Sequence, residues 1–151
     1  MILRPMTADE FPAYREIFIK EYADDIASLR GCSEADALTR ATSSIDLTLE
    51  QGVNTPQNRL LCIASPAEDT LGYLWLVVSG QTVWISDFYI YPQWRDQGLG
   101  AEALELLGNV LMVEGITEIG LRVATQNGAA KHLYEKAGFA VTGFNMSKSL
   151  I

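Results

Sequence analysis

The amino-acid sequence predicts a mixed α/β (α+β) fold in which helices flank a largely antiparallel sheet. Three β-rich runs, residues 59–65, 70–79 and 82–92, are separated only by short turn segments, which is the pattern of an antiparallel meander. An amphipathic helix follows, and then another β-rich run at residues 118–124. This succession of strand, helix and strand favours a parallel strand pair inside the otherwise antiparallel sheet.

The N-terminal third predicts one strand followed by two helices. Residues 2–6 form the strand, and Thr7 with Glu10 three positions later is a capping box that opens the first helix. One face of that helix is aromatic at helical spacing: Phe11, Tyr14, Phe18 and Tyr22. Gly31 ends this helix, and a second one, opening at a serine cap, is expected over residues 33–49.

The C-terminal half predicts two more helices. The first follows the meander and carries one apolar face: Leu99, Ala103, Leu106, Leu107 and Val110. Gly115 stops it. Residues 127–138 are expected to form the second helix, closed by Gly138, and residues 139–150 to supply one strand or a short hairpin.

The composition is that of an ordinary globular protein, and its length fits a single domain over residues 1–151. The net charge is −8 and the eleven Lys and Arg residues are scattered, which argues against nucleic acid as a partner. No run approaches the roughly 20 apolar residues that span a bilayer, and the N-terminus lacks a signal-peptide core, so we expect no membrane partner and a cytoplasmic location.

Few residues are suited to metal binding or covalent catalysis. Cys32 and Cys62 lie thirty positions apart, and His132 is the single histidine, so neither a disulfide framework nor a zinc site is expected. A reducing compartment fits this pattern. Cys62 lies in a β-rich run and is interpreted as core packing rather than as an acyl-accepting nucleophile, and His132 is interpreted as a surface residue.

The most informative stretch is residues 95–100, Arg-Asp-Gln-Gly-Leu-Gly, between the meander and the helix that follows it. The unpaired N–H groups of a first helical turn, together with the helix dipole, attract phosphate oxygens, and glycines let a ligand approach the backbone. Gly98 and Gly100 could instead form a simple loop. We favour an anion cradle, because two glycines weaken a helix start unless something is gained.

Two common phosphate-binding designs fit this stretch poorly. A P-loop requires Lys and Ser or Thr where this chain has Ala101 and Glu102. Residues 98–103 formally match the dinucleotide pattern GxGxxA, with Glu118 downstream at a suitable distance. However, residues 92–97 separate the strand from the first glycine, and the rest of the chain is too short for a six-stranded parallel sheet.

The run DFYIYPQWRDQGLGAEALELL, residues 87–107, resembles the coenzyme A motif of the GNAT superfamily of N-acyltransferases. The motif's Arg or Gln, Gly, and Gly or Ala positions are occupied by Arg95, Gly98 and Gly100. A second stretch is similar to the family's Asn…Ala…Leu-Tyr…Gly-Phe pattern: Asn127, Ala130, Leu133, Tyr134, Gly138 and Phe139. The order of elements agrees along nearly the whole chain, up to the final MSKSL segment.

The resemblance implies that the strands at residues 87–91 and 121–124 splay apart to open a cleft for acetyl-CoA. The backbone of Phe88 and Ile90 would pair with the pantetheine amides, while N–H groups of residues 97–101 hold the pyrophosphate. Asn127 would bind the pantetheine arm or order a water beside it. The full set implied to bind acetyl-CoA is Phe88, Ile90, Arg95, Asp96, Gln97, Gly98, Leu99, Gly100, Ala101, Asn127 and Tyr134.

Two residues are candidates for proton transfer. Tyr134 matches the family's general acid, which protonates the departing thiolate of coenzyme A, although it could also be a core aromatic beside Leu133. Asp87 is a carboxylate inside an apolar run, where burial would raise its pKa toward neutrality, so it is the candidate base. A hydrogen-bonding role for Asp87 at the strand edge, with a water chain as the base, is left open.

The resemblance therefore implies an N-acetyltransferase that moves an acetyl group from acetyl-CoA to a primary amine by direct attack within a ternary complex. A catalytically silent acyl-CoA-binding or interaction module of the same fold is the alternative. The acceptor, a small molecule or a protein amine, would meet residues of the first helix: Tyr22, Asp24, Asp25 and Arg30. The loop between the final strands would form another wall of its pocket. No metal is expected, and a homodimer is left open.

Overall fold

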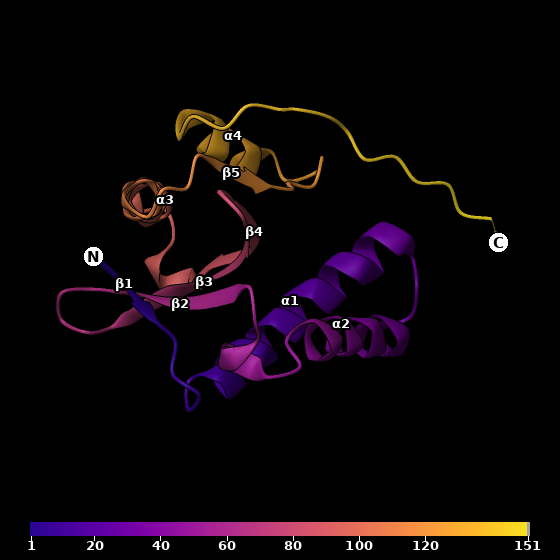
Figure 1. Cartoon of the computed structure of the whole chain (residues 1–151). Coiled ribbons are helices and arrows are strands. Elements are labelled where there is room, and N and C mark those ends of the chain that lie inside the picture. The colour runs from indigo at the N-terminus through magenta and orange to yellow at the C-terminus, as the bar shows by residue number, and fades with distance from the viewer. Residues whose placement is uncertain (151) are drawn as a thin grey trace.

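The computed structural model describes residues 1–150, in which helices cover both faces of a five-stranded sheet (Figure 1). The strands are β1 (Ile2–Pro5), β2 (Asn58–Ala64), β3 (Thr70–Ser79), β4 (Thr82–Ile90) and β5 (Glu118–Leu121). The helices are α1 (Phe11–Arg30), α2 (Glu34–Thr48), α3 (Leu99–Val113) and α4 (Gly128–Lys136), with short 3₁₀ turns η1 (Gly52–Asn54) and η2 (Pro92–Trp94). None of the helices within residues 1–150 is both long and apolar enough to cross a membrane.

The sheet order is β1-β2-β3-β4-β5, and the predicted mixed topology is confirmed. Strands β1 to β4 pair antiparallel with their neighbours, whereas β4 and β5 are parallel. Helix α3 makes the crossover between these two strands, as a parallel connection requires.

A β-bulge interrupts β4 near its middle. Trp75 of β3 lies opposite Asp87, but the next residue, Leu76, lies opposite Ile85, so Ser86 is an extra residue in β4. The ladder between β4 and β5 ends at the same place, with Ile85 paired to Leu121, while β4 runs on to Ile90. The two parallel strands therefore part just after the bulge. Strand β5 is shorter than predicted, because residues 122–124 lie beyond the ladder.

Two apolar layers cover the sheet, because side chains alternate between its faces. Toward α1 and α2 the buried residues include Tyr14, Phe18, Ala41, Ile45, Cys62, Tyr73 and Trp75. Toward α3 they include Leu61, Ile63, Leu74, Leu76, Ile85, Ala103, Leu104, Leu107 and Leu111. The buried stripe of α3 thus differs in part from the predicted one, since Leu106 and Val110 are only half-buried. Because α3 contains several leucines, either of two neighbouring helix faces could be the buried one. Packing against the sheet determines which face is buried.

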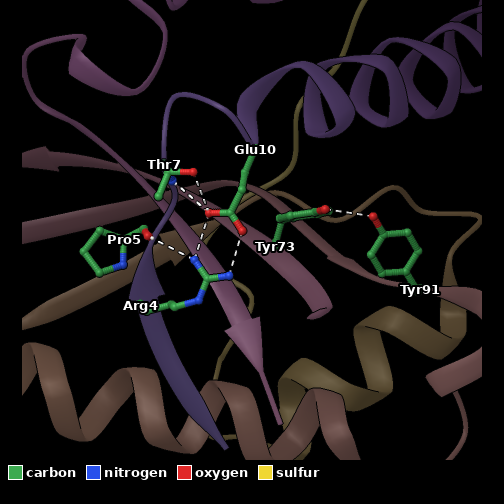
Figure 2. Close-up of polar contacts among 6 residues, drawn as sticks. All are labelled: Arg4, Pro5, Thr7, Glu10, Tyr73 and Tyr91. Atoms are coloured by element: carbon green, nitrogen blue, oxygen red, sulfur yellow. Dashed lines mark hydrogen bonds and ion pairs between the residues drawn. The ribbon is translucent and has the colours of Figure 1, made fainter. Parts of the chain in front are cut away.

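The first helix begins three residues later than its capping signal indicated. The Glu10 carboxylate accepts from the N–H and the hydroxyl of Thr7, at 2.9 and 3.0 Å, and pairs with Arg4 at 2.7 Å (Figure 2). These contacts close a turn before the helix, which starts at Phe11. At α2 the predicted serine cap is confirmed, because the Ser33 hydroxyl accepts from the Asp36 N–H at 3.1 Å.

The predicted C-terminal strand or hairpin is wrong. Residues 139–150 contain neither helix nor strand, and Figure 1 shows this segment running away from the sheet. A strand exists only when its backbone groups pair with a neighbour, and this segment has no ladder with β5. The loop expected to wall an acceptor pocket between two final strands is therefore absent from the described structure.

Candidate active site

The start of α3 has the geometry of an anion cradle. Gly98 is the N-cap residue and has a left-handed backbone, with φ of 78°, which a residue with a side chain adopts only under strain. Asp96 is also left-handed, with φ of 61°. Within residues 1–150 no side chain caps this helix, so its first N–H groups and the positive end of its dipole are presented together.

Gly100 has a packing role that the sequence did not reveal. A Cβ atom at this position would lie 3.3 Å from Leu133 Cδ2 in α4 and 3.8 Å from Phe88 Cζ in β4. The missing side chain therefore lets α3, α4 and β4 approach one another closely. This contact brings the cradle next to the part of β4 that β5 has left.

The open part of β4 presents backbone groups toward the gap. The N–H of Tyr91 donates to the Leu71 carbonyl of β3 at 2.9 Å. Because backbone groups alternate in direction along a strand, those of Phe88 and Ile90 point to the opposite edge, toward β5. These are the two residues expected to pair with pantetheine.

Arg95 folds back on the end of β4. Its Nε donates to the Ile90 carbonyl at 2.8 Å, and its guanidinium lies 5.2 Å from the centre of the Tyr89 ring. Its Nη2 is 4.0 Å from Glu21 of α1. Arg95, which lies in the loop before α3, therefore contacts both β4 and α1. Beside it, the Gln97 side chain donates to the Gln93 carbonyl at 3.3 Å.

Asp87 is held from the α1 side of the sheet. The buried Tyr14 hydroxyl donates to Asp87 Oδ2 at 2.7 Å. Desolvation raises the pKa of Asp87 to about 6, although the hydrogen bonds from Tyr14 and the Phe88 N–H act in the opposite direction. Burial also raises the pKa of Tyr14, which stays a phenol and so can keep donating. The expected raised pKa of Asp87 is confirmed.

Carboxylates of α1 act on the same group. Glu21 and Asp25 lie one helical turn apart, and both raise the pKa of Asp87 by charge repulsion. Burial, followed by repulsion from Asp24, raises the pKa of Asp25 itself. Among the predicted specificity residues, Asp25 therefore acts electrostatically on Asp87, while Asp24 lines a hollow between α1 and α2.

The remaining two predicted specificity residues show no comparable link to Asp87. Tyr22 packs against Phe18, with ring centres 5.5 Å apart, and Arg30 lies in the last turn of α1. The sequence reasoning missed Tyr14 and Glu21 as neighbours of Asp87. A signal existed for Glu21, because it and Asp25 have the i, i+4 spacing of one helix face.

Tyr134 lies on α4, on the other side of the sheet from α1. Its ring packs against Phe139, with centres 5.7 Å apart, and it belongs to the apolar layer beneath α3. Burial raises its pKa, and the charge of Asp87 raises it further, so the phenol is protonated at neutral pH. Tyr134 and Asp87 therefore lie within electrostatic reach of one another, from α4 and β4. Tyr134 is therefore a packing aromatic, and its role as proton donor stays a prediction.

Asn127 caps α4, because its Oδ1 accepts from the Ala130 N–H at 3.1 Å. Its predicted contact with pantetheine stays a prediction. Cys62 is buried, and desolvation raises the pKa of its thiol to about 11, which removes it as a nucleophile. His132 is exposed on α4, as expected. No group of three or more candidate metal ligands occurs among residues 1–150.

Comparisons with known proteins agree with this geometry. Residues 14–139 match the model of the acetyltransferase (GNAT) family. The uncharacterized N-acetyltransferase YycN of Bacillus subtilis is 30% identical over 99% of both chains. Its crystal structure superposes with a TM-score of 0.91, covering 99% of this chain and 98% of the other.

Two further matches are weaker. The fold is similar to that of the PaiA N-acetyltransferase from Thermoplasma acidophilum in complex with coenzyme A, with a TM-score of 0.73, 17% identity and coverage of 95% and 92%. Thialysine N-epsilon-acetyltransferase of Mus musculus is 29% identical over 66 residues, 44% of this chain and 39% of that protein. The match over residues 14–139 and the relation to YycN place the chain in one family. The chain belongs to the GNAT acetyltransferase family and is an N-acetyltransferase that uses an acyl-CoA.

Proposed function

We propose that the protein transfers an acetyl group from acetyl-CoA to a primary amine, by direct attack of the amine on the thioester. The observation that carries the proposal is the parting of β4 from β5 at the Ser86 bulge. That gap adjoins the glycine cradle of α3 and has Asp87 near one side and Tyr134 near the other. An anion site, an open strand edge and two proton-transfer groups are thus combined in one place.

The residues present fit coenzyme A. The left-handed Gly98 and the uncapped N–H groups after it suit a pyrophosphate, which needs donors and positive potential. The backbone groups of Phe88 and Ile90 on the open edge of β4 suit the pantetheine amides, which can pair with an edge like an added strand. Acetyl-CoA supplies the activated thioester carbonyl.

Asp87 and Tyr134 then divide the proton transfers. An amine is protonated at neutral pH, and Asp87, with a pKa of about 6, accepts its proton directly or through water. The amine nitrogen attacks the thioester carbonyl, and a strand N–H near Ile90 stabilises the oxyanion. When the carbon–sulfur bond breaks, Tyr134 donates its proton to the leaving thiolate and regains one from solvent. The products are an amide and the free thiol of coenzyme A.

The acceptor is proposed to be a cationic amine. Glu21 and Asp25 stand on α1 near Asp87 and give the acceptor side a negative potential, which attracts an ammonium. The partial relative thialysine N-epsilon-acetyltransferase is named for an amine substrate, which agrees with this proposal.

The test uses a thiol-release assay with acetyl-CoA and a panel of amines that includes lysine, diamines and a lysine-containing peptide. The proposal predicts release above the rate without amine, together with mass-spectrometric detection of the acetylated amine. A protein that gains thermal stability with acetyl-CoA but releases no thiol with any amine would instead be the silent binding module. Melting with NADH in place of acetyl-CoA is the matched control, and no stabilisation by NADH is expected.

A further inference from the structure

Trp84 is a large, partly exposed aromatic residue on the sheet face that carries Asp87. It lies opposite Val77 of β3, as Asp87 lies opposite Trp75. Val77 and Trp75 are two positions apart, so their side chains and those of the residues opposite them point to the same face. Trp75 belongs to the layer beneath α1 and α2. Trp84 therefore stands on the face from which the acceptor is proposed to reach Asp87.

The bulge at Ser86 makes Trp84 and Asp87 neighbours on this face. In a regular strand, the side chains of residues 84 and 87 would point to opposite faces, because their separation is odd. The extra residue in β4 shifts the alternation, so the two side chains follow one another with the spacing of Val77 and Trp75. That spacing is roughly 7 Å, which is twice the rise per residue of a strand. The indole is therefore the next side chain along this face from the candidate base.

The position of the indole is defined by β5. Trp84 is paired with Gly120 in the parallel ladder. A Cβ atom at residue 120 would lie 2.9 Å from Cε3 and 3.1 Å from Cζ3 of Trp84, so the six-membered ring fills the space of the missing side chain. Trp84 is nevertheless 47% exposed. The indole thus packs against β5 and still offers apolar surface to a ligand.

In the other direction along β4, the next side chain on this face is less suitable for a cationic acceptor. It is Tyr89, and the Arg95 guanidinium lies 5.2 Å from the centre of its ring. The positive charge of Arg95 repels an ammonium. The edge of β4 toward β5 is the proposed place of pantetheine, so it is not free for the acceptor. These contacts favour an acceptor that extends from Asp87 toward Trp84.

We propose that Trp84 is a specificity-determining residue whose indole binds the alkyl arm of the acceptor amine. The inference rests on the proposed function, because it places the reacting nitrogen at Asp87. The favoured acceptors are then primary amines whose nitrogen is carried on an unbranched chain of several methylenes. A methylene that lies on one face of a ring loses about half of its contact with water, so each one should tighten binding roughly twofold.

The first experiment measures binding of ethylamine, butylamine and hexylamine by calorimetry with free coenzyme A present, so no acetyl transfer occurs. In the parent protein, hexylamine should bind roughly tenfold more tightly than ethylamine. Trp84→Ala should remove this dependence on length, and Trp84→Phe should keep most of it. Leu47→Ala is the matched control, because Leu47 lies on α2 and is 72% exposed. Parent binding that does not strengthen with length, or the same length dependence in Trp84→Ala, would overturn the proposal.

The second experiment follows turnover and separates this proposal from the proposed function. Trp84→Ala should raise KM for hexylamine roughly tenfold, with kcat and the thermal shift by acetyl-CoA nearly unchanged. A lower kcat with an unchanged KM for the amine would mean that Trp84 acts only through its packing on Gly120, which contradicts the proposal. Absence of thiol release with every amine would refute the proposed function alone, because the calorimetric length dependence still decides the role of Trp84.

Discussion

Tyr14 should control the pH at which Asp87 works. The substitution Tyr14→Phe keeps the ring in the α1 layer and removes only the hydroxyl that donates to Asp87 Oδ2 at 2.7 Å. That hydrogen bond lowers the pKa of Asp87, so its loss raises the pKa above about 6. A hydrogen bond to a charged group contributes about 1.5–3 kcal/mol, or roughly 1–2 pKa units.

The consequence can be worked out at one pH. With a pKa of about 6 the Asp87 carboxyl is about three-quarters ionised at pH 6.5, whereas after a rise of about 1.5 units it is about one-tenth ionised. Turnover by Tyr14→Phe should therefore be roughly eightfold lower than that of the parent at pH 6.5, and nearly equal to it above pH 9. The assay is kcat against pH at saturating acetyl-CoA and amine.

A uniform loss of kcat at every pH, with an unchanged acid limb, would refute this reasoning. In that case Tyr14 would act only through packing, and Asp87 would not be the titrating group. Asp87→Asn is the companion variant. It should lose the acid limb altogether and lower kcat by roughly 10²-fold or more, because no base remains to accept the proton of the amine.

Three further predictions concern Tyr134, the cradle and stability. Tyr134→Phe should lower kcat roughly 10²-fold while acetyl-CoA affinity, measured by calorimetry, changes little, and an undiminished kcat would remove Tyr134 from the mechanism. Gly98→Glu should abolish the thermal shift by acetyl-CoA with the circular dichroism spectrum retained, whereas Gly108→Ala in the middle of α3, where a Cβ meets nothing within 4 Å, should keep it. Asp87→Asn should stabilise the fold by about 1–2 kcal/mol at pH 7.5, since the raised pKa of Asp87 makes the folded state less stable as pH rises from about 4 to 6. Urea titrations at pH 7.5 and pH 4 check this, and an equal gain at both pH values would contradict it.

The sheet and its helices could be predicted because their signals are local. Each signal involves residues that are close together in the sequence: the three runs of the meander, the serine cap of α2 and the glycine at the start of α3. Asp87 could be singled out for a similar reason, since a carboxylate in an apolar run is unusual. Its partner could not, because Tyr14 lies 73 positions away and looks like any other aromatic of a helix face.

The features that the sequence did not predict also have physical causes. The alternation in residues 139–150 favours a strand, but a strand needs a partner edge, and the sequence does not say whether one is available. Gly100 was assigned to ligand approach, whereas the structure shows that it also allows contact with Leu133 and Phe88 from distant parts of the chain. The bulge at Ser86, after which β4 and β5 separate, depends on the register of β4 with β3. It could not be recognised from the sequence.

The most direct test of the proposed direct transfer is a single turnover with the protein in excess over acetyl-labelled acetyl-CoA. Labelled coenzyme and protein are first incubated alone, and the best amine from the panel is then added while thiol, acetylated amine and intact protein mass are measured. Direct transfer predicts that thiol and label appear together in the amine, in equal amounts and only after its addition, with the protein mass unchanged throughout. Label on the protein before the amine is added, or no transfer to any amine, would contradict it.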